Sequence, residues 1–165
     1  LVRVDMGEPV TDGFSIPSVF QGNPIRMQPL SALQKTWPVT LVNMGNPHAV
    51  TYVDDPVTAP VTTVGPVLER DLAFPRKCNI EFVHVTDRSH IEMRVWERGA
   101  GETLACGTGA CAAMVASVLN GMIDRTAEVK LRGGTLTVEW SEADGHVYMT
   151  GPAAFVYDGV WLGDD

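Results

Sequence analysis

Short apolar runs, separated by glycine and proline, recur along the chain and predict a protein built mainly of β-strands. Several runs alternate apolar and polar residues in the period of two that a half-buried strand requires, most clearly residues 135–140, where Leu136, Val138 and Trp140 share one face. Turn residues at Gly133-Gly134 and at 142–145 predict that the strands after residue 126 form an antiparallel meander. The expected strands cover residues 2–6, 39–42, 49–53, 80–85, 91–96, 127–131, 135–140, 146–150 and 154–157.

One segment, residues 109–119, has helical composition but almost no polar face, and Asn120-Gly121 ends it. A helix that is apolar all round is buried all round, and small residues let other elements approach it closely. A second, short helix is expected within residues 61–71, whereas residues 8–38, with five prolines, indicate loops and short strands. One buried helix among eight or nine strands predicts an α+β fold in which the sheet wraps around that helix, rather than a βαβ repeat.

The composition is that of one ordinary globular domain covering residues 1–165. With 12 Lys+Arg against 20 Asp+Glu, the formal net charge of −8 argues against nucleic acid or an anionic membrane surface as a partner. No apolar run approaches the roughly 18 residues of a membrane-spanning helix, and no signal peptide is visible. An odd number of cysteines, three, favours a reducing compartment, so we expect a cytoplasmic protein. The chain begins at Leu1, within an expected strand and without an initiator Met, so we expect it to begin partway through a larger protein.

Cys106 lies in a glycine-rich stretch just before the buried helix. The N-terminus of a helix carries unpaired N–H groups and about half a positive charge, which lowers the pKa of a thiol and favours the reactive thiolate. The neighbouring glycines let the N–H groups of Gly107, Thr108 and Gly109 reach a carboxylate. Cys106 is therefore either a base beside a bound carboxylate or a small buried hydrophobe, and its position alone leaves both open.

The other two thiols are expected to be inert. Cys111 lies about 140° around the helix from Cys106, so we expect it in the core. Cys78 lies in an expected loop with no partner at a suggestive spacing.

Further polar residues beside the expected strands allow a structural and a functional interpretation, and residue type alone favours the structural one. Asn46 and His48 belong to the segment Gly-Asn-Pro-His, which either forms a tight turn or points polar groups into a site. Asn79 opens a strand as a cap or as a ligand. Glu97 and Arg98 form a surface pair or hold the ammonium and carboxylate groups of an amino acid.

Three other kinds of site have little support. The four histidines and three cysteines show no metal-ligand spacing, so no metal site is expected. Residues 107–112 match the dinucleotide fingerprint G-x-G-x-x-A but do not directly follow an expected strand. The G-x-S-x-G elbow of a serine hydrolase is absent from the sequence.

Taken together, these segments resemble the C-terminal half of the diaminopimelate epimerase family. The strand at Val4-Asp5-Met6, the segments 45–48 and 79–82, the run E-R-G-A-G-E-T at 97–103, C-G-T-G at 106–109 and Gly151-Pro152-Ala153 follow in family order. The resemblance covers nearly the whole chain. The related proline racemases also carry a C-G-T-G segment, but not the run that precedes it here.

The resemblance implies a mixed, largely antiparallel sheet curled into a barrel around the buried central helix, and chemistry without pyridoxal phosphate, metal or any other cofactor. In this family two cysteines face the α-carbon of diaminopimelate from opposite sides and interconvert its LL and meso forms for lysine and cell-wall synthesis. Cys106 would be the second cysteine, and Gly107 and Thr108 would donate N–H groups to the α-carboxylate. The positions that match substrate-binding residues are Asn46, Asn79, Glu97 and Arg98, and His48 matches a position near the site.

The first cysteine of the family lies in a C-G-N-G segment that this chain does not contain. The resemblance therefore implies an N-terminal domain as partner, and we expect the isolated chain to be inactive and to self-associate through the face that meets this domain. Two alternatives remain. One is a related cofactor-independent racemase or epimerase for another amino acid, against which the run at 97–103 argues. The other is a ligand-binding domain of the same fold without chemistry.

Overall fold

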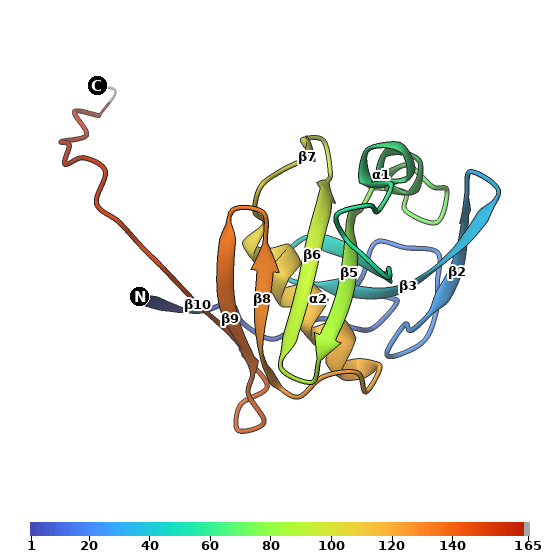
Figure 1. Cartoon of the computed structure of the whole chain (residues 1–165), viewed down its shortest axis with the longest axis horizontal. Helices are drawn as coiled ribbons and strands as arrows, with labels where there is room; N and C mark the ends of the chain where they lie inside the picture. The colour runs from blue at the N-terminus through green and yellow to red at the C-terminus, as the bar shows by residue number, and fades with distance from the viewer. Residues whose placement is uncertain (164–165) are drawn as a thin grey trace.

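The computed structural model describes residues 1–163 and shows a curved sheet with a helix packed against each face (Figure 1). The strands are β1 (Val2–Asp5), β2 (Gln28–Ala32), β3 (Lys35–Asn43), β4 (Pro47–Tyr52), β5 (Asn79–Asp87), β6 (His90–Glu97), β7 (Gly101–Glu102), β8 (Thr126–Leu131), β9 (Gly134–Trp140) and β10 (Val147–Gly151). The helices are α1 (Val61–Glu69) and α2 (Gly107–Leu119). The strand order is β1-β10-β9-β8-β6-β5-β4-β3-β2, and β7 pairs with β6 at the side.

Most neighbouring strands are antiparallel, as the short turns between them require. The pairs β4–β5 and β6–β8 are parallel, because α1 and α2 respectively lie between their strands in sequence and provide the crossover that a parallel pair needs. The predicted α+β class with a mixed, largely antiparallel sheet is confirmed. β1 and β2 stand at opposite ends of the strand order and are not paired with each other within residues 1–163, so closure into a barrel is not confirmed.

The predicted apolar helix is confirmed as α2, the centre of one core. It contacts strands β3 to β6 and β8 to β10, and its residues from Gly109 to Ser117 are buried. α2 begins at Gly107, two residues before the predicted start, because Cys106 caps it there. It ends before Gly121, whose φ of +70° is the left-handed conformation expected after the helix.

The central strands are covered on both faces. Successive residues of a strand point to opposite faces. Leu41 and Phe82 therefore pack with α1, whereas their neighbours Val42 and Val83 pack with α2. This double burial explains why these strands are continuous apolar runs, while the β8 residues alternate between buried and exposed. α1, predicted within residues 61–71, thus forms a second core on the face opposite α2.

The prediction of a strand at 154–157 is wrong. Residues 152–163 contain no helix or strand and extend away from the sheet (Figure 1). The composition suits a strand, but a strand forms only where another strand pairs with its backbone groups, and β1 already occupies that position beside β10. Six large apolar side chains here are at least 84% exposed: Phe155, Val156, Tyr157, Val160, Trp161 and Leu162.

Candidate active site

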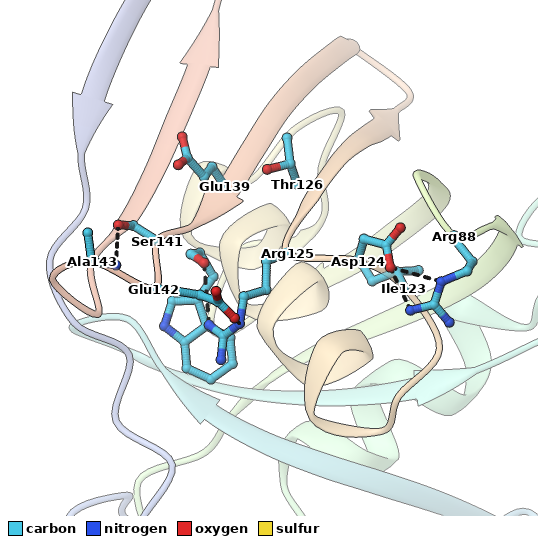
Figure 2. A pocket seen from close by; sticks show the side chains of 10 residues that line it. Arg88, Ile123, Asp124, Arg125, Thr126, Glu139, Ser141, Glu142 and Ala143 are labelled. Carbon is cyan, nitrogen blue, oxygen red and sulfur yellow. Dashed lines mark hydrogen bonds and ion pairs between the residues drawn. The ribbon is translucent and has the colours of Figure 1, made fainter.

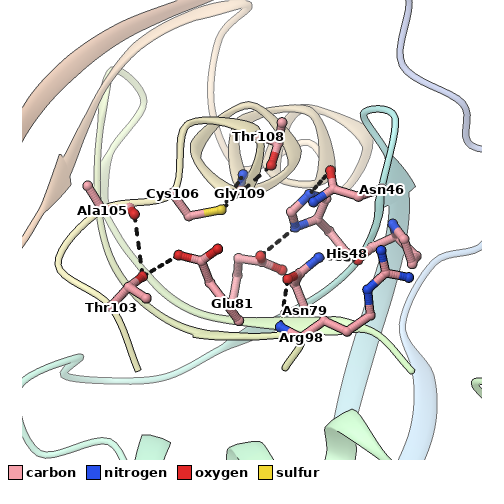
Figure 3. Close-up of polar contacts among 12 residues, drawn as sticks. Asn46, His48, Asn79, Glu81, Arg98, Thr103, Ala105, Cys106, Thr108 and Gly109 are labelled. Atoms are coloured by element: carbon pink, nitrogen blue, oxygen red, sulfur yellow. Dashed lines mark hydrogen bonds and ion pairs between the residues drawn. The ribbon is translucent and has the colours of Figure 1, made fainter. Parts of the chain in front are cut away.

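The register of the sheet gathers the candidate residues at the N-terminus of α2 (Figure 3). His48 in β4 lies opposite Asn79 in the parallel strand β5. Ile80, next to Asn79, pairs with Trp96 near the end of the antiparallel strand β6, so Glu97 and Arg98 arrive at the same edge. β7 and the loop after it then bring the chain to Cys106. Residues that are 60 positions apart in sequence, from Asn46 to Cys106, thus meet in one site.

Cys106 is the N-cap residue of α2. Its backbone is extended, with φ −142° and ψ 107°, and its Sγ accepts a hydrogen bond of 3.4 Å from the N–H of Gly109. The hydroxyl of Thr108 lies 3.6 Å from the same sulfur. The side chain is buried, with 7% of the residue exposed. A cysteine here takes the place that serine or aspartate usually occupies at a helix start.

The expected lowering of the thiol pKa is wrong. Burial of the thiol, followed by the charge of Glu81, raises the pKa of Cys106 to about 11, and the hydrogen bonds from Thr108 and Gly109 offset this only in part. The helix N-terminus is present as predicted, but loss of water and a nearby carboxylate outweigh its field. Cys106 is therefore a protonated thiol at neutral pH.

The first turn of α2 uses only part of its backbone N–H donors within the helix cap. The N–H of Gly109 is used by Cys106 Sγ, and the N–H of Ala110 bonds to the Cys106 carbonyl at 2.9 Å. Gly107 and Thr108 precede them, and the first N–H groups of a helix have no partner within the helix. That these two N–H groups bind a carboxylate stays a prediction.

His48 is fully buried and is held by two oxygen atoms. Its Nδ1 lies 2.6 Å from Glu81 Oε1, and its Nε2 lies 2.9 Å from Asn46 Oδ1. Sequence reasoning missed Glu81. The available signal was an acidic residue between the core residues Ile80 and Phe82, in a strand that is otherwise apolar.

Asn79 joins two segments of the site. Its side-chain amide donates a hydrogen bond of 2.8 Å to the Pro47 carbonyl, and its side-chain oxygen accepts one of 2.8 Å from the N–H of Arg98. The side chain therefore fixes the turn that carries Asn46 relative to the loop that carries Arg98.

Glu69, at the end of α1, holds the other side of the same loop and was also missed. Its carboxylate accepts a hydrogen bond of 2.8 Å from Trp96 Nε1 and one of 3.0 Å from the N–H of Gly99. These two donors flank the pair Glu97 and Arg98 in the sequence. Burial opposes ionisation of Glu69, but these two hydrogen bonds outweigh it and lower the pKa of the carboxyl. A charge-assisted clamp therefore fixes the segment that presents Glu97 and Arg98.

Glu97 and Arg98 point in different directions. Glu97 accepts a hydrogen bond from the Thr103 hydroxyl, which also contacts the carbonyl of Ala105, the residue before Cys106. Arg98, by contrast, extends away from Cys106 (Figure 3). The Arg98 guanidinium donates a hydrogen bond of 3.3 Å to the Arg76 carbonyl. Arg98 also lines a cleft of about 600 Å³, together with Arg76, Asn43 and Gly45. The site therefore has a thiol end and a cationic end.

A second cleft, of about 580 Å³, lies away from these residues, where β8 and β9 begin and end (Figure 2). Its two arginines already contact carboxylates, since Arg88 lies 2.6 Å from Asp124 and Arg125 lies 3.0 Å from Glu142. We assign it no function. Cys111 and Cys78, predicted to be inert, are fully buried, and burial raises the pKa of both thiols, that of Cys111 to about 12.

Within residues 1–163, no group of three His, Cys, Asp or Glu side chains is arranged to hold a metal ion. The helices of the same region include none that is both long and apolar enough to span a bilayer.

Comparison with known proteins places this geometry in a family. The family model of diaminopimelate epimerase matches residues 40–156. Diaminopimelate epimerases of Methanococcus maripaludis and Moorella thermoacetica are 52% and 54% identical over 96% of this chain, which spans 57% of their length. A probable proline racemase of Agrobacterium radiobacter, 13% identical, has a similar fold over 84% of this chain and 50% of its own, with a TM-score of 0.57. A predicted epimerase of Pseudomonas aeruginosa, 17% identical, matches 94% of this chain and 58% of its own, with a TM-score of 0.50. The chain belongs to the diaminopimelate epimerase family.

Proposed function

We propose that this chain is the C-terminal half of a diaminopimelate epimerase, an isomerase that interconverts LL- and meso-diaminopimelate in lysine and peptidoglycan-precursor synthesis. The observation that carries the proposal is the placement of Cys106 as the N-cap of a buried helix, next to the N–H groups of Gly107 and Thr108, which have no partner within the helix. This arrangement puts a proton donor and a carboxylate-binding turn side by side. Residues of a longer polypeptide or of a second chain complete the enzyme.

The chemistry is a proton transfer at the α-carbon between two thiols. A thiolate on one face takes the α-proton as the C–H bond breaks, and the Cys106 thiol gives its proton to the opposite face as the new C–H bond forms. A pKa of about 11 keeps Cys106 protonated and ready for this step at neutral pH. In the reverse direction Cys106 is the thiolate and removes the proton. The N–H groups of Gly107 and Thr108 stabilise the negative charge that develops on the α-carboxylate.

The two ends of the site suit a substrate with an amino-acid group at each end. The thiol end receives the reacting α-carbon, its carboxylate and its ammonium group, the last of these near Glu97. Arg98 and the cleft beside it receive the distal carboxylate, with Asn46 and Asn79 between the two ends. His48 positions Asn46 through the contact between its Nε2 and Asn46 Oδ1. We propose that this reaction needs no cofactor, as the family resemblance implies.

We further propose that the partner is an N-terminal domain that carries the second cysteine in a C-G-N-G segment. The exposed apolar side chains of residues 155–162 support this, because soluble domains rarely leave so many large apolar groups uncovered unless another surface covers them. In the absence of that domain, the same segment provides a route to self-association. The three free thiols suit a reducing, cytoplasmic compartment.

The test is to replace the corresponding half of the Moorella thermoacetica relative with this chain and to follow α-proton exchange on LL-diaminopimelate in deuterated water. We expect exchange and epimerisation by the joined protein and none by the 165-residue chain alone. Cys106→Ser in the joined protein is the matched control and removes epimerisation. Activity of the isolated chain, or inversion of proline but not of diaminopimelate by the joined protein, contradicts the proposal.

A further inference from the structure

Two residues of the run at 97–103, Glu102 and Thr103, have no part in the mechanism above. The run forms a hairpin, because β7 pairs with the end of β6 and Glu97 lies opposite Gly101. Successive residues of a strand point to opposite faces, so Glu102 and Thr103, at the end of β7, face different surroundings. Both carry polar side chains in residues that are only partly exposed. Their contacts show what each of them holds.

Glu102 ties β7 to the rest of the sheet. Its Oε1 accepts a hydrogen bond of 2.7 Å from Arg94 Nε and one of 3.1 Å from Arg132 Nη1, and its side chain is only 12% exposed. Arg94 Nη1 also donates to the carbonyls of Pro56 and Val57, at 2.8 Å and 2.9 Å. Hydrogen bonds between charged groups are the strong ones. β7 is therefore fixed relative to β6, to the turn between β8 and β9, and to the loop before α1.

The residue after Thr103 is anchored as well. The carbonyl of Leu104 accepts a hydrogen bond of 2.8 Å from the N–H of Gly133, in the turn between β8 and β9. Thr103 thus lies between two residues, Glu102 and Leu104, that are each bonded to other parts of the fold. Its backbone keeps its place without help from its own side chain, so the hydroxyl can orient another group.

That group is the carboxylate of Glu97. The Thr103 hydroxyl faces two acceptors, Glu97 Oε1 and, at 3.3 Å, the Ala105 carbonyl. A hydroxyl has one proton to donate, and a carboxylate is the stronger acceptor. The Glu97 side chain makes this single hydrogen bond within residues 1–163, so its Oε2 remains available to a ligand. After burial and the charge of Glu81, the charge of Glu97 also raises the pKa of Cys106, so the carboxylate lies within electrostatic reach of the thiol.

We propose that Thr103 is a positioning residue: its hydroxyl fixes the orientation of the Glu97 carboxylate, so that the second oxygen binds the α-ammonium group of an amino acid whose α-carbon faces Cys106. The anchors at Glu102 and Leu104 set the position from which Thr103 does so. That the ligand is diaminopimelate rests on the proposed function, whereas the orientation of Glu97 by Thr103 does not. The two ideas are therefore tested separately.

The direct test is a set of crystal structures of this chain, native and with Thr103→Val or Thr103→Ser. Valine has nearly the shape of threonine but no hydroxyl, whereas serine retains the hydroxyl. We expect the Glu97 carboxylate to leave its native position in Thr103→Val and to stay bonded to the hydroxyl in Thr103→Ser. A native crystal structure without this hydrogen bond, or a carboxylate that keeps its place in Thr103→Val, overturns the proposal.

A kinetic test uses the joined protein and LL-diaminopimelate. We expect Thr103→Val to lower kcat/KM about tenfold and Thr103→Ser to retain it, because a hydrogen bond to a charged group is worth about this factor. If Thr103 acts through Glu97, the same substitution in a Glu97→Gln background changes kcat/KM by less than about twofold, since residues that act as a unit are not additive. A purely structural role predicts the same tenfold loss in both backgrounds, and that result contradicts the proposal.

Two controls accompany the kinetic test. Ser89→Ala removes a hydroxyl that also bonds to a carboxylate, Asp87 Oδ1 at 3.0 Å, but lies in the turn between β5 and β6 and should leave kcat/KM unchanged. Circular dichroism checks that the variants fold, and Thr103→Ala takes the place of Thr103→Val if valine disturbs folding. An inactive native joined protein counts against the proposed function alone, because the crystal structures still decide the role of Thr103.

Discussion

At the N-terminus of α2 the polar side chains of His48, Asn79 and Glu81 are buried, whereas beyond β10 the apolar side chains of Phe155 and Trp161 are 100% and 87% exposed. His48 and Asn79 find their partners within the chain, through hydrogen bonds to Asn46, Pro47 and Arg98. Glu81 Oε1 contacts His48, whereas Glu81 Oε2 has no partner within residues 1–163. The exposed apolar groups have no comparable cover within residues 1–163.

The two regions thus differ in how their side chains are satisfied: those of the site by contacts within the chain, those of the C-terminal segment by no comparable contacts within residues 1–163. Burying polar groups is costly unless they are hydrogen-bonded, so the site is built to hold its geometry before any ligand arrives. Large exposed apolar groups are costly in water, which supports the proposal that another surface covers the C-terminal segment. Under the proposed function, the first region is a preorganised half-site and the second is the surface that the N-terminal domain covers.

The largest effect is expected from removing the thiol while retaining the helix cap. Cys106→Ser in the joined protein should lower kcat by about 10³-fold, because a hydroxyl is a far weaker acid than a thiol and does not form its anion at neutral pH, and proton transfer contributes about 10² to 10⁴. Serine is a good N-cap residue, so urea unfolding should show native stability. Loss of activity together with unfolding would mean that Cys106 is structural.

The buried state of the thiol should appear in its reaction with iodoacetamide. Since burial and Glu81 raise the pKa of Cys106 to about 11, its alkylation rate in the folded chain should rise about tenfold per pH unit, or about 100-fold from pH 8 to pH 10. The urea-unfolded chain, whose thiols titrate near pH 8.5, is the control and should level off near pH 9. A folded profile that levels off near pH 9 would show an unperturbed thiol.

Breaking the Glu69 clamp should destabilise the chain by an intermediate amount. Glu69→Gln replaces a carboxylate oxygen with an N–H that faces the donors Trp96 and Gly99, which should cost about 2 kcal/mol in urea unfolding at pH 7. Because the pKa of Glu69 is lowered in the fold, its contribution is present above its unfolded pKa and is lost as the pH falls through the folded value. The two proteins should therefore converge in acid. Glu92→Gln, at an exposed pair with Lys130, should change stability little.

The smallest effect on stability is expected at the exposed segment. The double variant Phe155→Ser and Trp161→Ser should keep the free energy of unfolding within about 0.5 kcal/mol, since neither side chain is buried. It should, however, reduce self-association in sedimentation velocity and weaken joining to an N-terminal half. Leu72→Ser, at a 93% exposed residue elsewhere on the surface, is the control. Equal self-association of the native chain and both variants would remove the assigned role of the segment.

The sequence predicts those helices and strands whose formation depends on residues close together in the chain. The all-apolar composition of residues 109–119 predicts α2, and alternation predicts β9, because local patterns determine these. Glu69 and Glu81 were not predicted as site residues, since their partners Gly99 and His48 lie 30 and 33 positions away. The direction of the Cys106 pKa was wrong because the fold buries the thiol, and in second place because the pairing of β5 in the sheet brings the charge of Glu81 near it. The segment 154–157 has strand composition without a strand partner, which sequence periodicity does not reveal.

The central claim is that this chain supplies one of two opposed thiols. It is tested most directly by turnover of LL-diaminopimelate in deuterated water by the joined protein, with mass spectrometry of the separated meso and LL forms. We predict one deuterium at the inverted α-carbon of the meso product, and loss of that deuterated product in Cys106→Ser. Undiminished formation of deuterated meso product by Cys106→Ser would contradict the account.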